Sequence, residues 1–312
     1  MSTDYQPWPR PPHNIRAVRE LATLAAQTGV RLQVSHVGLA GRRSWRLVDA
    51  VLEEVEDGKR AGGDIGFDVV PYPLGVGPMQ MLFPPSSVQE LQQGRLRRRT
   101  RSRLRLMAAV QPHLLGLGLG DVELLRSRDH RAAEFAGLDF TQIGRQLGKS
   151  PIDAQITVAL QSRLGAAVAL CGFSGDETDE GPLEALLTHR DAAVVSNAAS
   201  SAEGVPNPTA NGAFPRLLGR FVRQRRTLTL EEAVRRATAL PAERLGVPGI
   251  GRITEGARAD LVILDPATVD DGGWPKRPAG PPRGIHTVIV GGRVAAQRGT
   301  VVSVGNGRLL HS

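Results

Sequence analysis

Three polar residues lie at or near the ends of apolar, strand-like runs. His36 follows the alternating run 30–35, Asp68 lies inside the run 65–70, and Asn197 ends the run 192–197. Imidazole and carboxylate groups are common ligands of divalent metal ions, whereas a neutral amide is a poor one. A single histidine in a strand is more often structural than metal-binding, so the surrounding elements must decide its role.

The rest of the chain offers no stronger candidate for chemistry. It contains no His-x-His pair, no nucleophile elbow, no phosphate loop and no dinucleotide fingerprint. Cys171 lies within an apolar run and is predicted to be a small buried residue. The remaining histidines have no partners at metal-ligand spacing; they are His113, His130, His189, His286 and His311.

Strand and helix patterns alternate along the chain. Strands are predicted at 30–36, 65–70, 166–173 and 192–197, and helices at 14–28, 45–60, 88–110, 138–147, 151–164 and 182–189. Residues 75–85 are predicted to form a loop rich in Gly, Pro and Met. This order is typical of an α/β fold in which helices cover a parallel sheet.

The last hundred residues carry clearer local signals. Thr229 precedes two glutamates and predicts a helix N-cap, Leu240-Pro241 marks the start of a second short helix, and Gly246 ends it. A strand at 261–264 follows. The run 288–295, with Gly291-Gly292 at its centre, predicts a β-hairpin before a final strand at 301–304.

Composition narrows the class of protein. The chain has 312 residues, 41% of them hydrophobic and 22% charged, and a formal net charge of +8, which suits a globular protein with a substantial core. The single cysteine excludes an internal disulfide, and no apolar run is long enough to cross a membrane. The first residues lack the pattern of a signal peptide. We therefore expect a cytoplasmic protein without a membrane partner.

A basic run raises the alternative of a nucleic-acid partner. Seven arginines fall within eleven residues, which are Arg95, Arg97, Arg98, Arg99, Arg101, Arg103 and Arg105. Such a run neutralises several phosphates if it binds nucleic acid. No aromatic residue interrupts the run and no known binding motif surrounds it, so a solvated helix is the favoured interpretation.

Two phrases near the C-terminus resemble the amidohydrolases, the metal-dependent barrel hydrolases. Residues 238–246 match the family's Thr-x-x-Pro-Ala-x-x-Leu-Gly helix, and residues 256–262 match its Gly-x-x-Ala-Asp-Leu-Val turn. The stretch 212–220, Gly-Ala-Phe-Pro-Arg-Leu-Leu-Gly-Arg, narrows the resemblance to the D-aminoacylase branch, which comprises the N-acyl-D-amino-acid deacylases. Further matches are Val34-Ser35-His36, 68–72 and 148–154.

The resemblance implies the C-terminal half of a TIM-like barrel followed by a small β-sandwich segment. On this basis residues 1–13 are an irregular lead-in and 14–247 a partial barrel, with a basic helical insertion near 86–110. Residues 248–312 form the sandwich segment. About four barrel strands are expected, ending near His36, Val70, Phe173 and Asn197, fewer than the full barrel requires.

The resemblance also implies a chemistry that this chain only partly retains. Family members hydrolyse N-acyl amino acids through a water activated by Zn²⁺ or a similar ion, with an aspartate on the last strand as the base. His36 matches the strand-five histidine ligand. The strand-six segment has no histidine, leaving Asp68 as a weak candidate, and Asn197 replaces the catalytic aspartate. The loop after it has Pro206–Thr209 in place of a family histidine.

Zinc binding is therefore expected to be weak or absent. Tyr72, Arg216 and Arg220 are weak candidates for substrate contacts, the arginines for a substrate carboxylate. Three hypotheses follow: a truncated or mis-started hydrolase whose missing half lies upstream or on another chain, a degenerate pseudoenzyme retained for binding or assembly, and a basic nucleic-acid-associated protein. Exposed strand edges in a partial barrel predict self-association or a partner chain that completes it.

Overall fold

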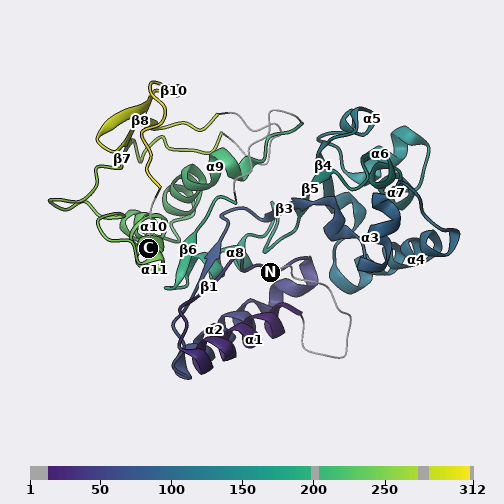
Figure 1. Ribbon diagram of the computed structural model, residues 1–312, viewed down its shortest axis with the longest axis horizontal. Helices are drawn as coiled ribbons and strands as arrows, with labels where there is room; N and C mark the ends of the chain where they lie inside the picture. The colour runs from purple at the N-terminus through teal and green to yellow at the C-terminus, as the bar shows by residue number, and fades with distance from the viewer. Residues whose placement is uncertain (1–12, 198–203, 273–280, 310–312) are drawn as a thin grey trace.

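The described residues form three sheets connected by helices, as Figure 1 shows for this computed structural model. The structure describes residues 13–197, 204–272 and 281–309. A parallel sheet lies at the centre, an antiparallel sheet with several helices lies at one end of the long axis, and a second antiparallel sheet formed by the C-terminal residues lies towards the other.

The central sheet contains three parallel strands in the order β1 (Leu32–Val34), β2 (Ile65–Val69) and β6 (Ala192–Val194). Val34 pairs with Phe67, and Phe67 pairs with Ala192, so the three carboxyl ends lie at the same edge. All five residues of β2 are buried, as expected of a strand flanked on both sides. β1 is an edge strand, and no described strand pairs with its other side.

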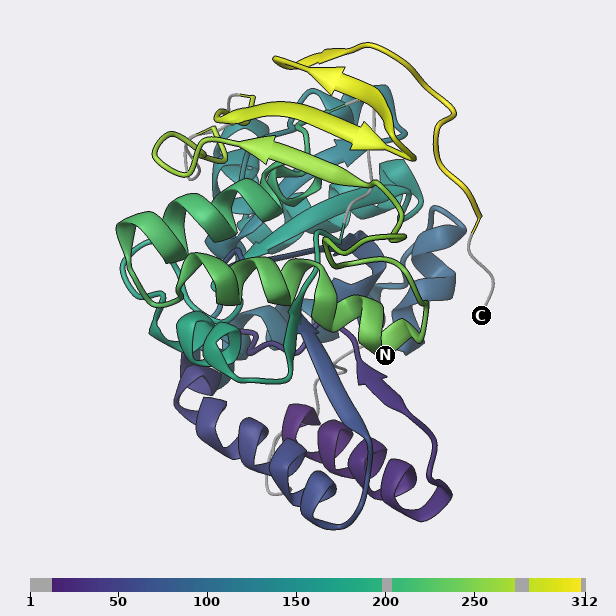
Figure 2. The same ribbon diagram turned by 90° about the vertical axis from the view of Figure 1, so that its left-hand side faces the viewer.

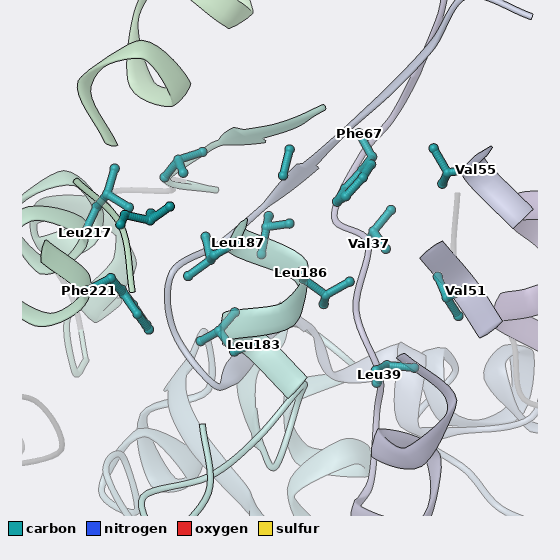
Figure 3. Packing of buried hydrophobic residues seen from close by; sticks show 14 of the residues in the cluster. Val37, Leu39, Val51, Val55, Phe67, Leu183, Leu186, Leu187, Leu217 and Phe221 are labelled. Atoms are coloured by element: carbon teal, nitrogen blue, oxygen red, sulfur yellow. The ribbon is translucent and has the colours of Figure 1, made fainter. Parts of the chain in front are cut away.

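Helices cover one face of this sheet. α1 (His13–Thr28) and α2 (Val48–Arg60) precede and follow β1, with the short 3₁₀ helix η1 (Arg42–Leu47) before α2, and α8 (Gly181–Thr188) leads into β6. Figure 3 shows Phe67 and Val37 lying between Val51 of α2 and Leu186 of α8. Apolar side chains that alternate along the strands pack against those of the helices, and together they form the larger of the two hydrophobic cores.

Two arginines from later helices hold the amino ends of the strands. Arg236 of α10 (Leu230–Ala237) is buried and donates to the carbonyls of Thr188, His189 and Ala192. Arg244 of α11 (Ala239–Leu245) donates to the carbonyl of Leu32 and to Asp64. Thr229 caps α10 by accepting from the Glu232 N–H, and Gly246 ends α11 at a positive φ of 69°, both as predicted.

The second sheet corrects the predicted number of barrel strands. The strand predicted at 166–173 is β5 (Ala166–Cys171), and it pairs antiparallel with β3 (Leu74–Pro78) and β4 (Val122–Ser127) rather than joining the central sheet. Three parallel strands, not about four, therefore make up the central sheet in the described residues. The run is apolar, and an apolar run does not reveal which sheet a strand joins.

The loop predicted at 75–85 contains β3 because its glycines permit close packing. A Cβ on Gly75 would lie 3.3 Å from the Phe173 ring, and one on Gly77 would lie 2.3 Å from the Met81 sulfur. Glycine in this strand therefore marks the approach of neighbouring side chains rather than a turn.

The segment from β3 to β5 is a larger excursion than the insertion expected near 86–110. It has its own core, which includes Met79, Phe140 and Ile156. The predicted single basic helix is two helices separated at Gly94, whose φ is 69°. The helical elements of this segment are η2 (Met79–Leu82), α3 (Pro85–Gln92), α4 (Arg98–Leu115), η3 (Leu119–Asp121), α5 (His130–Ala133), α6 (Phe140–Leu147) and α7 (Pro151–Ser162).

The C-terminal sheet is antiparallel, in the order β10 (Thr300–Val301), β9 (Arg293–Gln297), β8 (Ile285–Val290) and β7 (Leu261–Leu264). It confirms the predicted hairpin through the pairing of Val290 with Arg293. Figure 2 shows this sheet at the opposite side of the molecule from α1 and α2, with the green helices between them. Among the described helices, none has both the length and the apolarity needed to cross a bilayer.

Candidate active site

His36, Asp68 and Asn197 lie at the carboxyl-end edge of the central sheet. His36 comes two residues after the end of β1, Asp68 lies inside β2, and Asn197 comes three residues after the end of β6. Since Phe67 and Val69 face the helical core, Asp68 projects from the opposite face of the sheet. The strand register thus brings the three predicted residues to one edge, which is where barrel enzymes place their sites.

The Asp68 carboxylate is engaged by its own neighbours in the fold. One oxygen accepts the backbone N–H of His36 at 2.7 Å, and the other accepts the Ser35 hydroxyl at 3.2 Å. The side chain is buried, and its backbone carbonyl accepts the Val37 N–H. These bonds hold the chain in the sharp turn at His36, whose φ is 57°. Asp68 therefore has a structural role in this turn, as a single aspartate in a strand most often does.

Asn197 ends its strand in a left-handed conformation, with a φ of 48°. Its carbonyl accepts from the side chain of Asn207 at 3.4 Å. Asn207 in turn caps α9 (Pro208–Arg216) by accepting the Thr209 N–H. Residues 206–209, which stand where the resemblance places a histidine, therefore lead into the helix α9.

These three residues do not make a ligand set for a catalytic metal ion. A catalytic zinc site uses about three protein ligands, drawn from histidine, cysteine and carboxylates. His36 is exposed and offers one imidazole, Asp68 has both oxygens in hydrogen bonds, and Asn197 offers a neutral amide. Within the described part of the chain, neither His36 nor Asp68 belongs to a cluster of three histidine, cysteine or carboxylate ligands.

One such cluster does occur, but at the other end of the sheet. Glu56 of α2, His189 after α8 and Asp191 before β6 offer ligand atoms within 4.8 Å of one another. Two cations already neutralise it, because Lys59 pairs with Asp191 and Arg190 pairs with Glu56 at 2.9 Å. We interpret the cluster as an ion-pair network that joins α2 to β6 rather than as a metal site.

His189 lies at the centre of this network. Its Nδ1 accepts the Asp191 N–H at 3.4 Å, its Nε2 lies 3.2 Å from a Glu56 oxygen, and its ring packs against Phe67 at 5.2 Å between centroids. Burial lowers the pKa of His189 below its usual value despite the two nearby carboxylates. The residue serves packing and hydrogen bonding, and it lies beside two carboxylates that its spacing in the sequence did not reveal.

The predicted substrate contacts Tyr72 and Arg216 are buried in a second network. Arg216 pairs with Glu180 and donates to the Pro71 carbonyl at 2.7 Å, and its guanidinium lies 4.8 Å from the centre of the Tyr72 ring. Tyr72 donates its hydroxyl to Asp271 at 2.7 Å. Burial and the adjacent Asp271 charge raise the pKa of Tyr72 far above its usual value.

Arg220 joins the same network at its outer rim. It lies in η4 (Leu217–Gln224), a π-helix that continues α9, and it pairs with the second oxygen of Glu180 at 2.7 Å. Arg216 and Tyr72 are only 4% and 1% exposed, so neither reaches solvent in this structure.

Sequence reasoning missed the carboxylates of this network, Glu180 and Asp271. Neither lies in a recognisable motif, and they are separated from Arg216 by long stretches of chain. A buried arginine demands a carboxylate partner, but only the folded structure identifies which one.

Removal of the Glu180 charge should destabilise the protein. Glu180→Gln leaves the Arg216 guanidinium buried with a weaker partner, Asp271 at 3.6 Å. We expect the free energy of unfolding in urea to fall by about 3 kcal/mol.

Glu243→Gln is the matched control, because Glu243 pairs with Arg252 at the surface and is 53% exposed. Its loss should cost less than about 1 kcal/mol. Equal effects of the two substitutions would show that the buried network does not hold the fold together.

Comparison with known proteins agrees with this architecture. The model of the Amidohydrolase family matches residues 141–296, half of the chain. N-acyl-D-glutamate deacylase of Alcaligenes xylosoxydans xylosoxydans is 28% identical over 276 residues, covering 88% of this chain and 47% of the relative. D-aminoacylase of the same organism is 33% identical over 177 residues, 57% of this chain and 34% of the relative.

Solved structures give the same result. N-acyl-D-glutamate deacylase from Bordetella bronchiseptica, complexed with zinc and a phosphonate inhibitor, superposes with a TM-score of 0.70 at 26% identity, covering 90% of this chain and 50% of that one. A D-aminoacylase mutant superposes with a TM-score of 0.74 at 24% identity, which supports the fold alone. The chain spans about half the length of each of the two N-acyl-D-glutamate deacylases. By the family match, the chain belongs to the amidohydrolase family.

Proposed function

We propose that this chain carries one side of an amidohydrolase active site for N-acyl amino acids, in a form that is catalytically impaired. The relatives named above act on N-acyl-D-glutamate and similar compounds, which supports the substrate class. The observation that carries the proposal is the placement of His36, Asp68 and Asn197 at one edge of the parallel sheet, with an amide at the last position.

The chemical reason for impairment lies in that amide. Amide hydrolysis needs a base that takes a proton from the attacking water and passes it to the leaving nitrogen. The Asn197 side chain does not take up a proton near neutral pH, so it can hydrogen-bond a substrate but cannot perform this transfer. His36 and the engaged Asp68 do not replace it, because neither projects from β6.

The retained part of the site suits binding better than catalysis. His36 is exposed and has hydrogen-bonding capacity, and Asn197 offers a neutral amide at the same edge of the sheet. The alternative function of a pseudoenzyme retained for binding or assembly follows from the same residues. The two alternatives differ in whether a carboxylate at position 197 gives hydrolysis.

The purified chain should release no free amino acid from N-acetyl-D-glutamate or N-acetyl-D-aspartate with zinc present, as measured by amine detection. A rate that scales with protein and disappears in His36→Ala would contradict the proposal.

A second experiment adds the first half of a deacylase relative, produced separately, to supply the missing ligands. Under these conditions Asn197→Asp should exceed the unsubstituted chain by at least about a hundredfold, the contribution of a general base. Equal rates would favour the pseudoenzyme.

We further propose that the three parallel strands are part of a TIM-like barrel and that β7 to β10 are part of a β-sandwich. The open edge of β1 and the exposed Val262 and Ile263 of β7 support this, because isolated proteins rarely leave such edges and faces uncovered. We expect another polypeptide, either a second copy or a chain carrying the complementary half, to cover them.

Sedimentation velocity tests this expectation. The purified chain should form dimers or larger species, and Gln33→Pro, which places a proline on the open side of β1, should reduce them. Val301→Pro at the short strand β10 is the matched control on another sheet edge. A stable, monodisperse monomer across concentrations would overturn the proposal.

A further inference from the structure

The outward face of α4 presents both apolar and cationic side chains to solvent. Of the eighteen residues of this helix, only Leu104 is buried, while Leu106, Met107, Val110 and Leu114 are all exposed, Leu106 by 67%. Arg103 lies three residues before Leu106 and four before Met107, and Arg99 lies four residues before Arg103, so both arginines share this face. We call this surface, made of Arg99, Arg103, Leu106, Met107, Val110 and Leu114, the α4 ridge.

No carboxylate among the described residues forms an ion pair with the arginines of the ridge. Residues 98–115 contain no acidic residue. Two carboxylates that contact this helix are engaged by other groups, since Glu90 accepts from the Arg97 backbone and from Thr100, and Asp153 accepts from Arg105 at 2.9 Å. In the part of the chain that the structure describes, no ion pair forms at Arg98, Arg99 or Arg103.

The arginines on the inward side of α4, Arg101 and Arg105, lie in a different environment. Arg101 and Arg105 line a cavity of about 650 Å³ between α4 and α7, where Asp153 holds both. This arrangement fixes the helix to the body of the protein along one side. It leaves the ridge on the other side of α4, which lies beside α3 and α7 at the end of the long axis opposite the C-terminal sheet (Figure 1).

We propose that the α4 ridge is a docking surface for an anionic lipid bilayer. Arginines on an amphipathic helix pair with lipid phosphates, and the adjacent leucine, methionine and valine side chains enter the boundary between headgroups and acyl chains. The exposed face of a helix can lie along the flat surface of a bilayer, whereas a peptide partner is generally bound in a groove. Nucleic acid would require aromatic stacking or cations along the whole helix, and neither occurs on the ridge.

Vesicle co-sedimentation tests the proposal with the full chain. The chain should sediment with vesicles of phosphatidylcholine and phosphatidylglycerol, should not sediment with phosphatidylcholine alone, and should be released by salt. Arg99→Glu with Arg103→Glu should weaken binding to the mixed vesicles by at least about tenfold, because each arginine near the surface contributes to the attraction.

Two further variants separate the lipid surface from other anionic partners. Leu106→Gln with Val110→Gln keeps every charge and should weaken vesicle binding several-fold through loss of insertion. Arg293→Glu with Arg308→Glu makes the same change in net charge on the C-terminal segment and should leave binding unchanged. Circular dichroism and thermal unfolding should match the unsubstituted chain in all three variants.

The proposal is overturned if mixed vesicles do not bind the chain or if the control pair weakens binding as much as the ridge pair. It is also overturned if the glutamine variant binds normally while single-stranded DNA competes fully for the chain. That last result would assign α4 to nucleic acid.

Discussion

The buried guanidinium of Arg216 is the interaction on which the arrangement of this protein depends. It bonds Glu180 at the start of α8 and the Pro71 carbonyl after β2, and it lies over the Tyr72 ring. Tyr72 reaches Asp271, so one charge connects the central sheet, α8, α9 and the segment leading to the C-terminal sheet. A charge taken out of water is retained only with such partners. The same pairing removes Arg216 and Tyr72 from any role at the surface of the site.

The residues that stabilise the fold are distinct from the residues at the candidate active site. The described residues keep three parallel strands and the two arginines that hold their amino ends. At the carboxyl ends of these strands, Asn197 offers an amide, and Asp68 accepts the hydrogen bonds that form the turn at His36. Stability and catalysis depend on different residues, so a chain can lose the second and keep the first.

The sequence predicted local structure where the signal was local. The cap at Thr229, the end of α11 at Gly246 and the hairpin around Gly291-Gly292 depend on neighbouring residues, and each is confirmed. The strands before His36 and Asn197 were also identified, because alternation and an apolar run define β1 and β6, but they end earlier than predicted, at Val34 and Val194. The same signals do not say which sheet a strand joins, so β5 was assigned to the wrong one. Distant pairings such as Arg216 with Glu180 leave no trace in residue spacing.

Zinc binding by the purified chain is the most direct test of the central claim, that the scaffold is retained without a working metal site. Equilibrium dialysis followed by elemental analysis should give no stoichiometric zinc, and His36→Ala should behave like the unsubstituted chain. One tightly bound zinc per chain, lost in His36→Ala, would contradict the claim and show that His36 belongs to an assembled site.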